Sequence, residues 1–288
     1  MPELPEVETI RRHLEAVLPG RRIDAVIHLD ERMVKRSLLD AAAIRSRLTG
    51  ARVTRVTRRG KFLGLYLSSG GILLLHLGMS GRLVIELESA LVKLHTHFIV
   101  RMGGDDLRLT DPRRFGRIAW VSSLDLDLGI DPLSRRFTPA ALAQLLEGRS
   151  IAVKSALLNQ SLIAGLGNIY ADEALFWSGI HPLRPAGTLG ADEVDRLCRA
   201  IRKVLRRALR NRGTSFSDYV DALGHPGENQ HHLDVYGREG QPCRRCRSLI
   251  VRLVVGGRSS HYCPQCQVLR RPQGEPKFEI EGENYAEV

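Results

Sequence analysis

The chain has 288 residues, of which 43% are hydrophobic and 26% charged, and its formal net charge is +11. This size has room for two compact domains, and the basic surplus favours a polyanionic partner, with nucleic acid ahead of an acidic membrane surface. We do not expect a membrane-spanning or secreted protein, because no stretch of residues is apolar enough to span a bilayer and the first residues show no signal-peptide pattern. We therefore expect a cytoplasmic protein, in which clustered cysteines bind metal more often than they form disulfides.

The first six residues can bring an amine and two carboxylates together. Initiator methionine is normally removed before a small residue, so the mature chain is expected to begin with the secondary amine of Pro2. Such an amine condenses with an aldehyde carbon to give an iminium, while Glu3 and Glu6 could divide the acid and base roles. The same residues also suit a plain helix start, with an early proline and acids at the positive end of the helix dipole. Taken alone, the hexapeptide favours the plain helix start.

Hydrophobic periodicity predicts a helix from residue 5 to about 18, ended by Gly20, and then a β-rich region as far as residue 121. Glycine pairs separate the runs expected to be strands, which are 52–56, 62–67, 72–77, 83–87, 98–102 and 118–121. This pattern indicates an antiparallel sandwich or barrel that carries the first helix.

Two loops of this β-rich region carry side chains that need an explanation. Met79 lies in His-Leu-Gly-Met-Ser-Gly, and Arg113 and Phe115 lie in Asp-Pro-Arg-Arg-Phe-Gly. An exposed phenylalanine beside arginine could insert into a DNA base stack, whereas a buried phenylalanine at a hairpin corner is commoner. Lys61 begins an apolar strand and could point either to solvent or into a cleft.

Residues 122–139 predict a linker, and the chain then becomes helical. Within residues 159–170 a glycine turn joins two helices, and Asn168 stands where the second begins. Exposed N–H groups at such a start favour a phosphate, although glycine and asparagine also cap plain helix corners. Lys154 could add a cation to the same phosphate or be a solvated lysine. Cys198 falls on the apolar face of a later, longer helix and is expected in the core.

Two Cys-x2-Cys pairs follow a loop rich in glycine, asparagine and histidine at 213–236. Cys243 and Cys246 are separated by sixteen residues from Cys263 and Cys266, which is the spacing of a structural zinc site with four thiolates. The segment between the pairs predicts a β-hairpin, so we expect one closed zinc ribbon-like finger with no open catalytic position. A pair of disulfides is the less favoured alternative in a cytosolic protein.

Together these motifs resemble the formamidopyrimidine-DNA glycosylase and endonuclease VIII family of bacterial base-excision repair enzymes. The resemblance runs from Pro2 to about Cys266, and Leu4 is typical of the formamidopyrimidine branch, since the other branch has glycine there. The matching blocks are 2–8, 60–61, 76–81, 111–116, 165–170 and the four cysteines. Because the blocks occur in the family's order, the resemblance overturns the plain helix start as the interpretation of the first six residues.

The resemblance implies an α+β multidomain fold with an N-terminal antiparallel β-sandwich, a helix–two-turn–helix domain and a zinc finger. The implied parts are a catalytic sandwich at 1–121, a linker at 122–139, a helical domain at 140–236, a finger at 237–268 and an acidic tail at 269–288, which we expect to be disordered. The implied partner is double-stranded DNA with oxidised bases or abasic sites, bound by a monomer in the bacterial cytoplasm, where DNA holds it at the nucleoid.

The resemblance also implies roles in removal of an oxidised purine and cleavage of the strand by β,δ-elimination. Pro2 would be the Schiff-base nucleophile, Glu3 the proton donor and Glu6 a supporting carboxylate. Lys61 would contact phosphate or lesion and is a candidate proton donor for elimination. The other implied DNA contacts are His95, Arg113, Lys154, Asn168 and Arg258, with Met79, Arg113 and Phe115 filling the void left by the everted base and Thr214, Ser215 and Tyr219 closing over it.

Two departures from the family pattern bear on these expectations. The segment 227–230, Gly-Glu-Asn-Gln, lacks the aromatic residue expected before the glutamine, so the lesion preference could differ. The acidic tail is longer than usual and could screen the basic cleft or bind a partner, although an extension without a function is an equally favoured alternative. The alternatives are an endonuclease VIII-like enzyme for oxidised pyrimidines and a non-catalytic zinc-ribbon protein that binds DNA.

Overall fold

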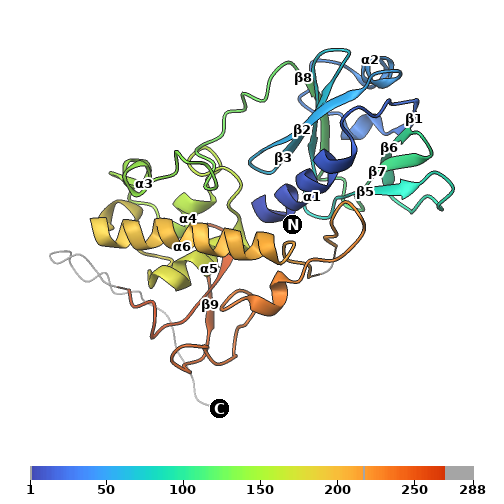
Figure 1. Ribbon diagram of the computed structural model, residues 1–288. Helices are drawn as coiled ribbons and strands as arrows, with labels where there is room; N and C mark the ends of the chain where they lie inside the picture. Colours follow the sequence, from blue (N-terminus) through green and yellow to red (C-terminus); the bar gives the residue numbers. More distant parts are fainter. Residues whose placement is uncertain (1, 217, 270–288) are drawn as a thin grey trace.

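The computed structural model describes residues 2–216 and 218–269 as two lobes joined by an extended segment (Figure 1). The first lobe holds two β-sheets, and the second is helical and carries a small hairpin. Apart from Leu269, the acidic tail lies outside the described residues. None of the described helices is long and apolar enough to cross a membrane.

Helix α1 (Leu4–Val17) lies along the sandwich where the two lobes meet, with its first turn facing the helical lobe (Figure 1). Pro5 stands in that first turn, where a missing N–H costs nothing, and the Glu6 carboxylate accepts the backbone N–H of Glu3 at 2.8 Å. Val7, Ile10 and Leu14 are fully buried against the sheets. The predicted first helix is therefore present, and its apolar face joins it to the sandwich.

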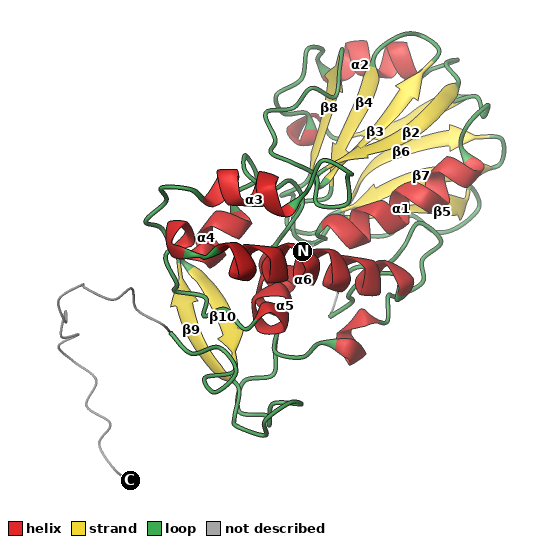
Figure 2. Cartoon of the chain, turned by 60° about the vertical axis from the view of Figure 1, so that its left-hand side comes forward, coloured by secondary structure: helices red, strands yellow, loops and turns green. Residues whose placement is uncertain are grey.

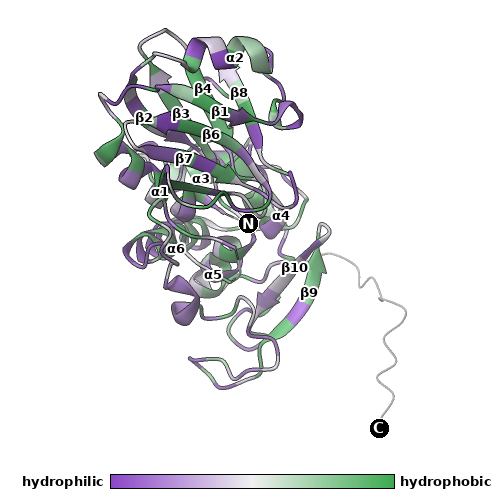
Figure 3. Cartoon of the chain, turned by 90° about the vertical axis from the view of Figure 1, so that its right-hand side faces the viewer, coloured by the Kyte–Doolittle hydropathy of each residue, from purple (hydrophilic) through white to green (hydrophobic). Residues whose placement is uncertain are grey.

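The sandwich consists of two four-stranded antiparallel sheets with strand orders β1-β6-β7-β5 and β2-β3-β4-β8. In Figure 3 its strands carry much of the hydrophobic colour of this lobe. Side chains from both sheets and from α1 form one continuous core. The strands are β1 (Ala25–Leu29), β2 (Val53–Arg59), β3 (Phe62–Leu67), β4 (Ile72–His76), β5 (Arg82–Leu87), β6 (Thr96–Met102), β7 (Asp105–Thr110) and β8 (Arg117–Val121).

Sequence periodicity misses strands β1 and β7 and two helical segments, η1 (Glu31–Met33) and α2 (Ala41–Leu48). Strand β7 escapes because Asp106 and Arg108 occupy buried positions that an apolar pattern would fill. Their charges are satisfied locally, since the Arg108 Nη2 lies 2.9 Å from Asp106 Oδ2 and its Nη1 lies 3.1 Å from Glu86 Oε2. Buried polar residues that pair with each other leave no period-2 signal.

The helical lobe begins at α3, and residues 122–138 form no helix or strand, as the predicted linker requires. A second core collects the apolar faces of its helices, and Cys198 is a buried member of it, as predicted. The elements are α3 (Pro139–Leu146), α4 (Val153–Leu158), α5 (Asn168–Ser178), η2 (Ala186–Thr188), α6 (Ala191–Arg210) and η3 (Asn229–His232).

A hairpin of β9 (Val251–Val255) and β10 (Arg258–Tyr262) packs beside α4 and α5 (Figure 2). The contact centres on a fully buried ion pair, in which the Lys154 Nζ lies 2.7 Å from Asp172 Oδ1. Both members also bind β10, because Lys154 donates to the Ser259 carbonyl at 2.6 Å and Asp172 accepts the His261 N–H at 2.8 Å. This ion pair therefore fixes the hairpin on the two helices.

Asp172→Ala should lower the free energy of unfolding by about 3–5 kcal/mol, because it leaves the buried Lys154 ammonium without its anion. Replacing both members by apolar residues, as Lys154→Met with Asp172→Leu, should regain most of that loss. Urea unfolding of the metal-loaded chain measures both effects. The exposed pair partner Asp195→Asn is the control, and a loss below about 1 kcal/mol for Asp172→Ala would contradict this account.

Candidate active site and metal centre

The start of α1 meets the start of α5 at the junction of the two lobes. The Leu4 N–H donates to the Gly165 carbonyl at 3.0 Å. The buried Glu3 carboxylate accepts the N–H of Ile169 at 3.0 Å and that of Tyr170 at 3.5 Å. The N–H groups at the α5 start thus bind an anion, but this anion is the Glu3 carboxylate and not the phosphate that the sequence suggested.

Three glycines make this close approach possible. A Cβ at Gly165, which has φ +92°, would lie 2.8 Å from the Leu4 Cβ, and one at Gly167 would overlap the Glu3 side chain. Gly213, with φ +83°, packs against Glu6 in the same way, because a Cβ added there would lie 2.8 Å from Glu6 Oε1. The sequence suggested that the first two glycines admit a ligand, but what they admit is the protein's own first turn.

Glu6 lies at the centre of a buried hydrogen-bond network. Its carboxylate accepts the Tyr170 hydroxyl at 2.5 Å and the Thr214 N–H at 2.8 Å, besides the Glu3 N–H. The Thr214 hydroxyl lies 2.9 Å from that of Tyr170 and accepts the Asn229 amide N–H at 2.9 Å. The network therefore connects α1 with α5 and with the loop at 213–236.

Burial makes these carboxyl groups weak acids. Desolvation is the main cause that raises the pKa of Glu3 to about 7, the Glu6 charge raises it further, and Lys61 and the helix N–H groups oppose the rise. Burial also raises the pKa of Glu6 and lowers the pKa of Lys61. Glu3 can therefore hold or release a proton near neutral pH, directly beside the buried Pro2.

Four cationic or amide side chains of the predicted site lie at different depths. Lys61 is half-buried and close enough to Glu3, Glu6 and Arg258 for all three to affect its pKa, so it lies at the junction of the two lobes rather than in open solvent. Arg258 is exposed at the start of β10, and the Asn168 side-chain amide donates to the Ser259 carbonyl beside it at 3.0 Å. Lys154 is neither the solvated lysine nor the phosphate-binding cation that the sequence suggested, because it is fully buried and its ammonium is paired with Asp172.

Phe115 is exposed over 53% of its surface, so the alternative of a buried phenylalanine at a hairpin corner is wrong. The Arg113 guanidinium, also exposed, lies 4.7 Å from the centre of the Phe115 ring. Met79 is half-buried on the neighbouring loop, and His95 is exposed with φ +63°. These loop side chains form an exposed group with both apolar and cationic character.

The loop at 213–236 joins the two lobes. Thr214 is buried at its start, and the half-buried Ser215 donates from its hydroxyl to the Tyr219 carbonyl at 2.8 Å. Tyr219 and Ala222 are buried in the core of the sandwich, and the Ile85 N–H of strand β5 donates to the Ala222 carbonyl at 2.9 Å. A segment of the helical lobe is thereby fixed to the sandwich.

Sequence reasoning missed Tyr170 and Asn229 as members of the Glu6 network. Tyr170 belongs to the Gly-Asn-Ile-Tyr segment that the sequence singled out. Its position in the first turn of α5 is the signal by which sequence reasoning could have placed it in the site. Asn229 offered none, since it lies in the segment 227–230, noted only for its missing aromatic residue, and is far from Glu6 in the chain.

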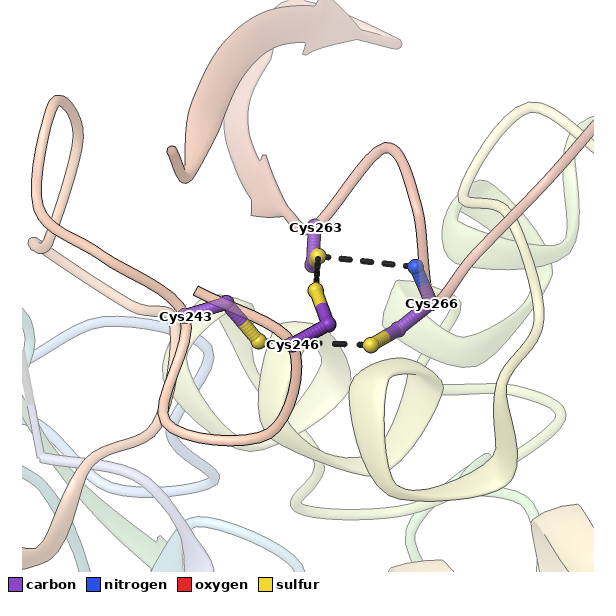
Figure 4. A group of neighbouring side chains, drawn as sticks. All are labelled: Cys243, Cys246, Cys263 and Cys266. Carbon is purple, nitrogen blue, oxygen red and sulfur yellow. Dashed lines mark hydrogen bonds between the residues drawn. The ribbon is translucent and has the colours of Figure 1, made fainter. Parts of the chain in front are cut away.

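The four predicted cysteine ligands come together in the finger (Figure 4). Their sulfur atoms all lie within 4.8 Å of one another, with 4.0 Å between Cys243 and Cys266 and 3.4 Å between Cys246 and Cys263. A tetrahedral Zn²⁺ with bonds of about 2.3 Å needs sulfur atoms about 3.8 Å apart. The donor set therefore fits one zinc ion and leaves no coordination position for a substrate.

Three family models match the chain in sequence. They are the formamidopyrimidine-DNA glycosylase N-terminal domain at 1–118, the formamidopyrimidine-DNA glycosylase H2TH domain at 128–220, and the zinc finger found in FPG and IleRS at 240–268. The four cysteines are therefore the zinc site of such a finger. The fold is likewise the one expected, with sheets, a helical domain and a C-terminal finger in that order.

Relatives match over nearly the whole chain. The formamidopyrimidine-DNA glycosylases of Syntrophomonas wolfei and Roseiflexus sp. are each 46% identical, over 93% of this chain and 100% of the relative. A complex between the Lactococcus lactis Fpg and DNA containing an abasic site has a TM-score of 0.87 at 34% identity, covering 93% of this chain and 100% of that one. A MutM complex with DNA containing carbocyclic 8-oxo-G has a TM-score of 0.86 at 33% identity and the same coverage. The chain belongs to the formamidopyrimidine-DNA glycosylase family.

Proposed function

We propose that this protein removes oxidised purines from duplex DNA through an N-terminal proline and then cuts the strand as an abasic-site lyase. Family membership makes it an oxidised-base DNA glycosylase of base-excision repair, and solved relatives are complexes with DNA that contains Fapy-dG, 8-oxo-G or an abasic site. The observation that carries the mechanism is the buried Glu3 carboxyl, with its pKa near 7, beside Pro2 at the junction of the lobes.

The chemistry begins at the free amine of Pro2, once Met1 has been removed. The amine nitrogen bonds to C1′ of the damaged nucleotide while the bond from C1′ to the base breaks; the base leaves with the electron pair and takes up the proton that the amine loses. Protonated Glu3 gives its proton to the deoxyribose ring oxygen, the ring opens, and an iminium forms between the nitrogen and C1′. The iminium acidifies the neighbouring sugar hydrogens, and successive β- and δ-elimination expel the phosphates on both sides.

Glu6 supports this chemistry without transferring the main proton. Its bond to the Glu3 N–H holds the first turn in place, and its bonds to Tyr170 and Thr214 connect that turn to the 213–236 loop. Thr214, Ser215 and Tyr219 of this loop close over the everted base. Because these contacts are buried, the loop and the nucleophile are positioned together.

The DNA lies over the exposed cations and loops on either side of this junction. Lys61, Asn168 and Arg258 bind phosphates around the lesion, and His95 binds the backbone further along. Lys154 contributes indirectly, because its buried pair with Asp172 fixes the hairpin that carries Arg258. Met79, Arg113 and Phe115 fill the void left by the everted base, and Arg113 also contacts the opposite cytosine; the exposure of Phe115 supports this role.

A second substrate class is supported by one observation. A complex of the wild-type Lactococcus lactis Fpg with DNA containing an oxidised pyrimidine has a TM-score of 0.86 at 33% identity. Oxidised pyrimidines are therefore the alternative substrates, and base-release rates on a panel of lesions decide between the classes.

We further propose that the protein acts as a cytoplasmic monomer, since one chain supplies every residue of the site.

Borohydride should trap a covalent adduct between the Met1-processed protein and duplex DNA that contains 8-oxoguanine. Pro2→Gly removes the secondary amine, and a retained or blocked N-terminus removes its nucleophilicity, so each should reduce trapping on the order of 1,000-fold. Gel analysis with intact-mass confirmation of the N-terminus measures this. Full trapping by a protein with a blocked N-terminus would exclude Pro2 and point to a lysine nucleophile.

The rate of sugar-ring opening, followed as the borohydride-trappable adduct on a duplex with an abasic site, should fall as the pH rises above about 7, because Glu3 must be protonated to donate to the ring oxygen. The Glu6 charge raises the pKa of Glu3, so Glu6→Gln should move this descending limb to lower pH. The Lys61 charge lowers the same pKa, so Lys61→Met should move the limb to higher pH. Single-turnover rates from pH 5 to 9 measure the positions of the limbs. Shifts in the same direction for both variants would contradict the assignment to Glu3.

Cys246→Ser, or removal of zinc by a chelator, should weaken binding to undamaged duplex by about 10-fold or more, because the hairpin that holds Arg258 loses its support. The slope of log Kd against log salt should fall in magnitude by about one if a single phosphate contact is lost. Fluorescence anisotropy at several salt concentrations measures both quantities. Cys198→Ala, a change in the core outside the finger, is the control and should keep its zinc and its slope.

A further inference from the structure

One buried carboxylate joins the two loops that carry Met79, Arg113 and Phe115. Asp111 is fully buried, and its Oδ1 accepts the Ser80 hydroxyl at 2.6 Å and the Arg113 N–H at 3.3 Å. Its Oδ2 accepts the Gly116 N–H at 2.7 Å. A single side chain thus bonds to the residue after Met79 and to both ends of the segment that presents Arg113 and Phe115.

The two loops are also packed backbone against backbone. Gly78 has φ +63°, and a Cβ there would lie 2.5 Å from the Gly116 nitrogen and from the Phe115 carbonyl carbon. At Gly116 an added Cβ would lie 3.1 Å from Asp111 Oδ2. Gly78 has no room for a side chain and Gly116 has little, so the two loops are in direct backbone contact beside the bonds to Asp111.

The main chain of Asp111 is fixed to strand β6. The buried His97 ring lies between Asp30 and Asp111, with its Nδ1 3.1 Å from Asp30 Oδ2 and its Nε2 3.0 Å from the Asp111 carbonyl. The Asp111 N–H donates to the His95 carbonyl at 2.9 Å. The backbone that carries the Asp111 carboxylate is therefore fixed to the sheet, and through this carboxylate the two loops are fixed as well.

Among the described residues, no lysine or arginine forms an ion pair with Asp111. Its charge is held by one hydroxyl and two backbone N–H groups, all of which belong to the two loops. Burying a charge without a counter-ion is costly, and an apolar residue would fill a simple core position better. The arrangement is suited to keeping two loops in one fixed geometry.

We propose that Asp111 is the positioning residue of the void-filling group, making the Met79 loop and the Arg113–Phe115 loop one preorganised wedge. This inference rests on the proposed function, because it requires that the three side chains enter the stack of duplex DNA. The wedge must fill the gap while the damaged base leaves. Loops that had to order at that moment would lose part of their binding free energy to conformational entropy.

Asp111→Ala removes all three bonds and should lower kcat/KM for base release from a duplex with 8-oxoguanine opposite cytosine by about 10- to 100-fold, the range expected for bonds to a buried charge. Asp111→Asn should restore most of the activity, because its oxygen can accept from Gly116 while the Ser80 hydroxyl turns to accept from its amide. Ser80→Ala, which loses one bond and little volume, should give an intermediate loss and covers the case in which Asp111→Ala does not fold.

Two further measurements separate positioning from general damage to the fold. Borohydride trapping on a single-stranded abasic oligonucleotide, which has no opposite base and no void, should change by less than about 3-fold in each variant. A fluorescent 2-aminopurine placed opposite the lesion should show less unstacking on binding. Asp195→Asn, on the exposed surface of α6, is the matched acid-to-amide control and should match the wild type in every assay.

A double-mutant cycle provides the decisive result. In a background with Met79, Arg113 and Phe115 all changed to alanine, adding Asp111→Ala should lower kcat/KM by less than about 3-fold, because the side chains that Asp111 positions are absent. A full additive loss there, or an equal loss on the single-stranded substrate, would overturn the inference. Failure of the proposed function looks different, because the wild-type protein itself would then release no base or form no adduct.

Discussion

The Glu3 carboxyl group is the contact on which the rest of the molecule depends. It stands before the first turn of α1 and accepts the leading N–H groups of α5, so it joins the sandwich to the helical lobe beside Pro2. Burial and the Glu6 charge favour the protonated acid, while the Lys61 charge and the N–H groups at the helix start favour the ionised carboxylate, and the pKa of about 7 is the balance of these effects. One residue therefore both assembles the two lobes and sets the proton chemistry.

The buried polar residues follow the same principle elsewhere in the chain. The Lys154–Asp172 pair fixes the hairpin that presents Arg258, and Asp111 fixes the loops that present Phe115. Each charge is costly to bury, and each forms at least one hydrogen bond or ion pair with a segment distant in sequence. The exposed residues that we propose to contact DNA are thus held in place by buried residues behind them.

The regular parts of this fold follow from sequence because their signals are local. The amphipathic first helix, six strands and the two cysteine pairs each lie in a short segment whose period or spacing shows the structure directly. Strand β7 was hidden because Asp106 and Arg108 pair with each other inside the sheet. Sequence alone cannot decide between the two interpretations of Lys154, because its partner Asp172 lies in a different helix, α5.

By itself, the sequence determined the first helix, the antiparallel strands, the zinc ligands and, through its ordered motifs, the family. Only the tertiary structure decided that Gly165 and Gly167 receive Glu3 rather than a ligand, and that Tyr170, Thr214 and Asn229 join Glu6 in one network. The reason is physical. Periodicity and spacing record which side of a segment is buried, whereas pKa values and hydrogen-bond partners depend on desolvation and on contacts between residues as many as 213 positions apart.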